Sequence, residues 1–290
     1  MAVDCTAVRR LMVLVCLLPG PAVFSAQGAP DQLPPAQAQA LVIRTLANEL
    51  RAAQDRGHPM RYLLRKTSPR LTTTKQIVET RDGAVARLIA INGAPLSAAD
   101  EQKEQARLDT LLADPELQRH RKVGEETDTG RALKVLRALP RAFIYQYAGS
   151  EDGPSGKLAK FTFRPNPEFD PPDLETLVLT AMSGEVWIDI DAERVARLKG
   201  RLDRDADLGW GLIGKLYKGG WIAIEQADVS GGQWRTVRFQ MQMSGRVFFR
   251  TRVFNTTEVE THFEPVPAGL GYVQAVQMLL ADTSPNSSGR

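Results

Sequence analysis

Between Arg141 and Pro265 the sequence consists almost entirely of short segments that alternate apolar and polar residues, joined by turns that contain glycine. Alternation of this kind places apolar side chains on one face of a strand and polar side chains on the other. Strands that follow one another without intervening helices pair antiparallel. The region therefore predicts an antiparallel sheet with one apolar face. The predicted strands are AFIYQYAG, KLAKFTF, EVWIDID, RVARLKGRLD, GWIAIEQA and the hairpin VRFQMQMSGRVFFRTRVF.

The hairpin, residues 237–254, has its apolar side chains mainly at odd-numbered positions on both sides of Ser244-Gly245. This apolar face has to pack against the protein's own helices or against an apolar ligand, and methionine suits both environments because it adapts to varied shapes. Packing on the predicted helices at 38–56 and 98–139 is the alternative that needs no ligand. The predicted ligand-binding residues are Val237, Phe239, Met241, Met243, Val247, Phe249, Val259 and Phe263.

The register of the next strand is predicted from its side-chain pattern. A three-residue loop centred on Thr256 would place Val253 opposite Val259 and Arg252 opposite Glu260. Apolar pairs would then share one face and opposite charges the other, and each such pair contributes a few tenths of a kcal/mol. A slip of one residue would destroy both patterns.

The N-terminal part predicts one helix followed by three strands. The helix starts at Pro34, carries an apolar stripe of Ile43, Leu46, Ala47 and Leu50, and stops at Gly57-His58-Pro59. The strands cover Met60–Lys66, Leu71–Thr80 and Ala84–Ile91, with Asp82-Gly83 as a hairpin turn between the second and the third.

Helices interrupt the strands at two further places. Ser97 with Asp100 forms a capping box that opens a charged helix through Arg121, and a shorter helix follows at Arg131–Leu139 and ends at Pro140. A helical turn is predicted at Pro172–Met182.

The first residues have the pattern of a secretory signal peptide. Arg9 and Arg10 precede the apolar run Leu11–Leu18, and small residues near Ala26 offer a cleavage site. A membrane-anchored N-terminus is the alternative, although the run is shorter than the roughly 20 residues that span a bilayer. Both cysteines, Cys5 and Cys16, lie in this segment. Export without cysteine in the mature chain favours a bacterial envelope protein, in the periplasm or secreted.

The predicted organisation is a signal peptide at 1–26, a linker at 27–37, one domain at 38–280 with a helical insert at 97–139, and a loose tail at 281–290. No second hydrophobic run follows the signal, so no transmembrane segment is expected after its removal. The formal net charge is +3 and basic residues interleave with acidic ones. We therefore expect no nucleic-acid partner.

A glycine pattern at residues 209–216, GWGLIGKL, fits G-x-G-x-x-G and part of a P-loop. Both phosphate-binding motifs require a strand before the glycines and a helix after them. RLDRDAD precedes this stretch and a predicted strand follows it. Turns and close packing beside Trp210 and Trp221 explain these glycines better than nucleotide binding.

Asp189 and Asp191 point the same way from one strand, at a separation of roughly 6.5–7 Å. That distance suits a carboxylate-pair glycosidase, but alternation with buried neighbours predicts that Trp187 and both carboxylates face water. His58, His120 and His262 have no partner at metal-ligand spacing. We therefore expect no metal, no cofactor and no enzymatic activity.

The residues 177–191, LVLTAMSGEVWIDID, place a short helix, a glycine and a V-W-I-D strand in succession. This resembles the G-x-(V/I)-W-I-D strand of the outer-membrane lipoprotein-sorting (LolA-like) superfamily. The segments LYKGGWIAIEQADVSGGQW and MSGRVFFRTRVFNTTEVETHF look like those of uncharacterised bacterial members. The resemblance covers roughly residues 38–265 and carries over no catalytic residue.

The resemblance implies an α+β fold, a half-barrel in which one curved antiparallel sheet is covered on its concave face by helices. It also implies an apolar ligand, a lipid or a lipoprotein acyl chain, between the sheet and the helices. The alternative function is a periplasmic interaction or sensor module that binds another envelope protein through the curved sheet, with Trp187, Asp189, Asp191 and the charged insert as its contact surface.

Overall fold

The computed structural model describes residues 33–208, 214–247 and 250–282, all within one compact unit, Leu33–Arg290. The predicted signal peptide lies outside the described residues. The elements are α1 Pro35–Gln54, β1 Met60–Thr67, β2 Thr72–Val78, β3 Val85–Ile91, β4 Ala94–Pro95, α2 Ala98–Ala113, α3 Pro115–Ala142, β5 Phe143–Asp152, β6 Lys157–Pro165, α4 Leu174–Leu177, the 3₁₀ helix η1 Val178–Ala181, β7 Met182–Asp189, β8 Arg194–Leu202, β9 Ala206–Leu208, β10 Gly214–Leu216, β11 Trp221–Asp228, β12 Trp234–Val247, β13 Arg250–Pro265 and α5 Tyr272–Ala281.

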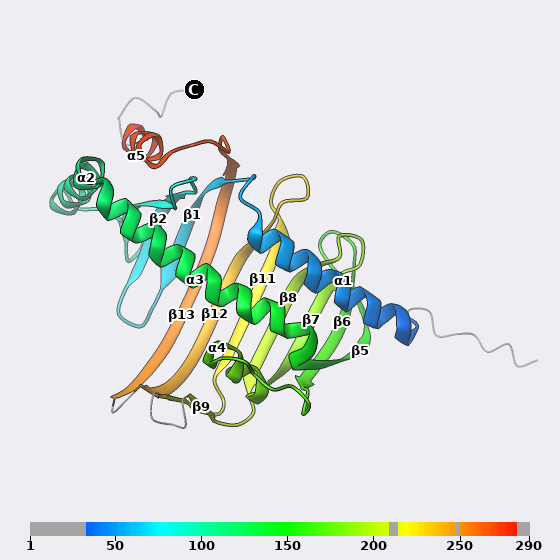
Figure 1. Ribbon diagram of the computed structural model, residues 1–290. Helices are drawn as coiled ribbons and strands as arrows, with labels where there is room; N and C mark the ends of the chain where they lie inside the picture. The colour runs from blue at the N-terminus through cyan, green and yellow to red at the C-terminus, as the bar shows by residue number, and fades with distance from the viewer. Residues whose placement is uncertain (1–32, 209–213, 248–249, 283–290) are drawn as a thin grey trace, which may run out of the picture. The chain divides into compact units, whose positions relative to one another are not determined.

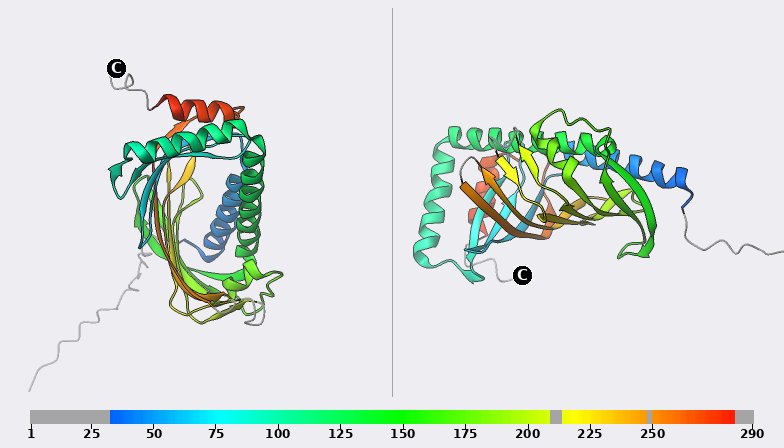
Figure 2. Two further views of the ribbon diagram at one scale, coloured as in Figure 1. Left: turned by 90° about the vertical axis from the view of Figure 1, so that its left-hand side faces the viewer. Right: turned by 90° about the horizontal axis from the view of Figure 1, so that it is seen from below.

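The strands of the described residues form one antiparallel sheet (Figure 1). Its main order is β4-β3-β2-β1-β13-β12-β11-β8-β7-β6-β5, and the short β9 and β10 pair beside β12. Figure 2 shows the sheet curving around α1 and α3. The predicted fold class, an α+β fold with a curved antiparallel sheet covered by helices on its concave face, is confirmed.

The connection between β4 and β5 crosses the whole sheet, because these strands lie at its opposite edges. Ten strand spacings of about 4.8 Å make the sheet roughly 48 Å wide. The 28 residues of α3 extend about 42 Å at ~1.5 Å per residue. The segment predicted as a helical insert is therefore the crossing that this strand order requires.

Two prolines explain why the helices of this connection differ from the prediction. The prediction of one charged helix through Arg121 is wrong, because α2 ends at Ala113 and α3 begins at Pro115. At the first position of a helix the missing N–H of proline costs no hydrogen bond. Asp114 caps the new helix through the backbone N–H of Glu116 (3.0 Å). The prediction of a separate helix at Arg131–Leu139 is also wrong, since α3 runs unbroken to Ala142 and contains Pro140 in its last turn.

Helix α1 packs on the sheet with a different face from the predicted stripe. Its buried residues are Ala38, Leu41, Val42, Thr45, Leu46 and Glu49, whereas Ile43 and Ala47 are exposed. The Glu49 carboxylate accepts hydrogen bonds from Arg194 Nε (2.8 Å) and the backbone N–H of Val195 (2.9 Å). Gln226 Nε2 donates a third (3.2 Å). A buried carboxylate that ties the helix to β8 and β11 explains why the buried face includes polar residues.

Helices α2 and α5 cover the opposite face of the sheet at the β2–β3 end. Val78 and Val85 form a pair on that face and pack with Leu108 of α2 and Val276 of α5. No element is predicted for residues 266–280, and α5 lies at Tyr272–Ala281. Arg87, fully buried on the same face, donates to the carbonyl of Leu279 and pairs with Glu101.

The predicted register of the last hairpin is wrong. Ser244 and Gly245 lie inside β12, and β13 continues through Thr256, which pairs with Met241. Val253 pairs with Ser244, and Val259 pairs with Arg238. The two β-branched threonines after Asn255 favour an extended strand over a loop. The pairing of β12 with β13 reaches Val247 with Arg250, and residues 248–249 lie outside the described residues.

Two glycines permit the bend of the sheet between β7 and β8. Gly184 pairs with Gly200, and a Cβ on Gly184 would collide with the carbonyl oxygen of Lys199 and approach the Phe163 ring to 2.7 Å. A Cβ on Gly200 would lie 2.9 Å from the sulfur of Met182. Both missing side chains point to the helix-covered face, on the inside of the curve, where glycine allows close backbone approach.

We expect Gly184→Ala to lower the free energy of unfolding by about 2–4 kcal/mol, because backbone atoms cannot move aside as a flexible side chain can. Urea unfolding followed by circular dichroism measures this. Gly124→Ala in α3 is the matched control, since its Cβ would meet nothing within 4 Å, and it should stabilise by about 0.5–1 kcal/mol. Equal stabilities for the two variants would contradict this account of the bend.

Candidate functional site

The middle of α3 stands away from the sheet. Residues 123–128 are exposed without exception. Six residues exceed one helical turn of about 3.6 residues, so no side of the helix is buried at this level. The Glu125 carboxylate nevertheless accepts a hydrogen bond from the backbone N–H of Ala84 (2.9 Å) in the β2–β3 turn. A Cβ on Gly124 or Gly130 would also meet nothing within 4 Å. In Figure 1 helix α3 as a whole crosses in front of β13, β12 and β11 on its way from α2 towards α4.

Both ends of α3 are fixed. Near its start, Gln118 Nε2 donates to the carbonyl of Asp82 (2.8 Å) and Lys122 Nζ donates to that of Arg81 (3.1 Å), both in the β2–β3 turn. Near its end, Ala138 and Ala142 are buried in the main core. The helix therefore spans the helix-covered face as a bridge.

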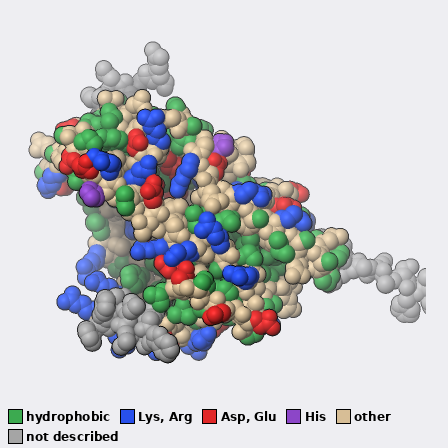
Figure 3. Space-filling view, viewed as in Figure 1, with side chains coloured by type: hydrophobic (Ala, Val, Ile, Leu, Met, Phe, Trp, Pro, Cys, Tyr) green, Lys and Arg blue, Asp and Glu red, His purple; other side chains and the backbone are tan. Residues whose placement is uncertain are grey.

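The sheet beneath this bridge presents half-buried apolar side chains. Ile222 pairs with Met241 and Ile224 pairs with Phe239, so these four share the helix-covered face. Phe239, Met241 and Ile224 belong to neither buried core cluster. We call the following set the apolar strip: Ile222, Ile224, Phe239, Met241, Tyr62 and Leu64. Figure 3 shows this side of the molecule, where hydrophobic side chains reach the surface among Lys and Arg side chains.

The structure brings together part of the predicted ligand-binding set. Phe239, Met241 and Met243 lie on the helix-covered face, and Met243 packs against the main core. Val237 lies where the pairing of β11 with β12 shifts register. Val259 faces the other side, because its partner is Arg238. Phe263 stacks on Tyr62 with ring centroids 5.3 Å apart.

Phe249 and the side chain of Val247 lie outside the described residues. Ile222, Ile224, Tyr62 and Leu64 also belong to the helix-covered face but are not among the predicted ligand-binding residues. Alternation in WIAIEQA and MRYLLRK was the signal for them, but it did not reveal which strands would become neighbours of β12.

Acidic side chains on β13 interrupt the apolar strip. Glu258 lies opposite Phe239 on the same face and forms an ion pair with Lys66 (2.7 Å). Burial, with the nearby carboxylates of Glu258 and Glu79, raises the pKa of Glu260 to about 7. Burial, with Glu260 and Glu79, also raises the pKa of the Tyr62 hydroxyl. Below pH 7 Glu260 is therefore mainly neutral and compatible with an apolar neighbour.

The face of β7 that points away from the helices differs from the prediction. Trp187 and Asp189 are buried, not exposed to water. Lys160 Nζ lies 4.9 Å from the centre of the Trp187 ring and the guanidinium of Arg197 lies 5.1 Å from it, so basic side chains cover the indole. The Asp189 carboxylate accepts from the backbone N–H groups of Asp191 (3.1 Å) and Ala192 (2.8 Å), which makes it the cap of a turn.

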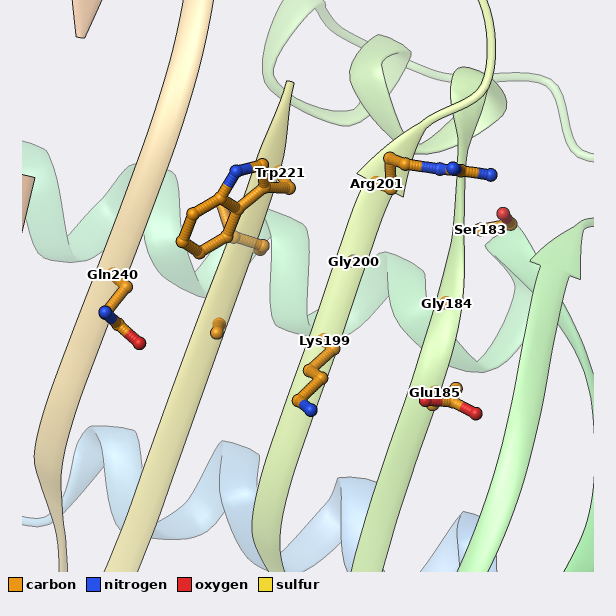
Figure 4. Close-up of a pocket in the computed structure, with 10 residues that line it drawn as sticks. Ser183, Gly184, Glu185, Lys199, Gly200, Arg201, Trp221 and Gln240 are labelled. Carbon is orange, nitrogen blue, oxygen red and sulfur yellow. The ribbon is translucent and has the colours of Figure 1, made fainter. Parts of the chain in front are cut away.

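This outer face also carries a depression of about 550 Å³ over β7, β8, β11 and β12. The small side chain of Ala223 and the backbone of Gly184 and Gly200 line it, and Lys199, Trp221 and others rise around it (Figure 4). Trp221 lies directly opposite Arg201. The depression is polar and charged at its rim, unlike the apolar strip on the other face.

Other candidate motifs show structural roles or lie outside the described residues. Gly209 and Gly211 fall in the undescribed segment, whereas Gly214–Leu216 form β10. His58 Nδ1 lies 2.6 Å from an Asp55 carboxylate oxygen, and His262 occupies a bulge with a positive φ of 57°. Among the described residues, no three His, Cys, Asp or Glu side chains are grouped closely enough to hold a metal ion.

No family model matches the sequence, and no curated protein matches it. Among solved structures, one similar chain is an outer membrane lipoprotein-sorting protein domain from Vibrio parahaemolyticus, with 10% sequence identity and a TM-score of 0.34. The match covers 82% of this chain and 99% of that chain. The two structures are weakly related in arrangement, and the fold described above rests on its own contacts. Within residues 33–208, 214–247 and 250–282, no helix is long and apolar enough to cross a membrane.

The raised pKa of Glu260 predicts a pH-dependent stability. Between its ordinary value of 4.5 and about 7, the folded protein holds a proton that the unfolded chain has released. The free energy of unfolding therefore falls as the pH rises through this window. Glu260→Gln should raise the free energy of unfolding at pH 8 by about 1–3 kcal/mol and change it little at pH 4.5.

Urea unfolding of both proteins across this pH range measures the effect. Glu264→Gln is the control on the same strand, because that carboxylate is 61% exposed in its ion pair with Arg61. The difference in the free energy of unfolding between the wild type and Glu260→Gln should change between pH 5 and 7, to the disadvantage of the wild type. If the wild type stays level or gains stability relative to the variant over this range, the raised pKa of Glu260 is contradicted.

Proposed function

We propose that this protein is an exported bacterial envelope protein that binds a lipid or lipoprotein acyl chain, without catalysis, between α3 and the apolar strip. The observation that carries the proposal is that Phe239 and Met241 are only half-buried on the face of the sheet that α3 crosses, and that residues 123–128 of this helix are exposed. A chain-like apolar molecule lying along these side chains would complete their burial. The weak likeness to a lipoprotein-sorting domain agrees with this proposal but does not carry it.

The chemistry of the strip suits such a ligand. Each buried methylene contributes about 0.8 kcal/mol, so one or two acyl chains bind firmly without polar contacts. Methionine and branched aliphatic side chains accommodate chains of different length. Neutral Glu260 beside the strip limits the cost of placing an apolar group there.

Binding of another envelope protein is the second candidate function, and the depression on the outer face favours it. Trp221 and Arg201 lie side by side there, and these residue types are enriched in protein interfaces. A partner at this face would be lost with Trp221→Ala, whereas an acyl chain bound under α3 would remain.

Native mass spectrometry of protein purified gently from its own host tests the proposed ligand. We expect mass increments of acyl-chain lipids on the wild-type protein. Phe239→Gln and Met241→Gln should lower lipid affinity about tenfold or more, because each places an amide against the ligand. Ile43→Gln, at an exposed position of α1, is the matched control. A wild-type protein that carries no lipid would contradict the proposal, and so would an equal loss of lipid binding in all three variants.

A further inference from the structure

Strand β13 extends past the strand beside it. The last pair between β1 and β13 is Thr67 with Thr257, so residues 250–256 pair with β12 alone among the described strands. In Figure 1 this free part of β13 and the turn between β1 and β2 lie at the same end of the sheet.

Exposed apolar side chains gather at this end. Val253 is 70% exposed and Phe254 is 39% exposed on the free part of β13, and Leu71 beside the β1–β2 turn is 43% exposed. They do not belong to either core cluster. Val253 and Phe254 point to opposite faces of the strand, so apolar surface is offered on both sides of the sheet end.

Arginines surround these apolar side chains. Arg65, Arg70, Arg250 and Arg252 are all exposed, and within the described residues none of the four has an acidic side chain at ion-pair distance. Glu258, the nearest acidic residue along β13, is already paired with Lys66 (2.7 Å). This end of the sheet therefore carries an excess of positive charge.

We propose that this end of the sheet docks on the surface of a bilayer that contains anionic lipids. Arginine guanidinium groups would bind the lipid phosphates, while Val253, Phe254 and Leu71 enter the boundary between headgroups and acyl chains. The contact is shallow, because the unpaired backbone N–H and C=O groups of residues 250–256 need water or headgroups as partners.

Charge also distinguishes a lipid surface from strand addition by a protein. A free strand edge invites another strand, and charged side chains on that edge discourage it. Arg250 and Arg252 place two such charges on the free part of β13. The membrane contact does not depend on the acyl-chain site under α3, so either proposal stands if the other fails.

Vesicle co-sedimentation of the purified full chain tests the proposal. Vesicles of phosphatidylcholine with phosphatidylglycerol should bind the wild-type protein, and vesicles of phosphatidylcholine alone should bind it weakly. Arg250→Gln/Arg252→Gln should lower binding roughly 10–30-fold, at about fivefold for each basic residue near a charged surface. Val253→Ser should also weaken it, and raised salt should release the protein.

Matched variants elsewhere keep the result specific. Arg137→Gln/Arg141→Gln removes the same charge from exposed positions of α3, and Ile43→Ser removes an exposed apolar side chain from α1. Both should bind like the wild type, with circular dichroism confirming that every variant is folded. The proposal is overturned if the wild type binds neutral vesicles as well as anionic ones, or does not bind anionic vesicles. It is also overturned if the control variants lose as much binding as the variants of β13. Capture of a protein strand by residues 250–256 with no vesicle binding overturns it as well.

Discussion

The pairing of β1 with β13 is the contact on which the rest of the structure depends. It joins residues 60–67 to residues 257–265, from opposite ends of the chain. Two series of hairpins thereby become one sheet, with β4 at one edge and β5 at the other. This order forces the connection between β4 and β5 to cross the sheet from edge to edge, and α2 and α3 make up that connection.

The exposed middle of α3 follows from that crossing and not from a sequence motif. Hydrogen bonds from Gln118 and Lys122 hold one end of the helix at the β2–β3 turn. Burial of Ala138 and Ala142 holds the other end in the main core. A straight helix fixed at both ends of a curved sheet leaves its middle unpacked.

Buried charged groups are where sequence patterns misled most. Glu49 satisfies its carboxylate with Arg194, 145 positions away, and Arg87 donates to Leu279, 192 positions away. Asp189 bonds the backbone of its own turn. Alternation assigns a charged residue to water, because burial of an unpaired charge is costly. Hydrogen-bonding partners that are distant in sequence remove the cost of burying these charges, and a local sequence pattern does not predict such partners.

The sequence by itself determined the longer strands, most of the turns, α1, and the antiparallel character of the sheet, but not the short strands β4, β9 and β10. These depend on alternation and glycine signals within a few residues, such as Asp82-Gly83. It also identified Phe239 and Met241 as one apolar face of β12. Tertiary structure decided which strands became neighbours, that Val259 faces away from Phe239, and that α3 bridges this face. Strand order and register join residues far apart in the chain, so their energies lie in contacts that no short window of sequence contains.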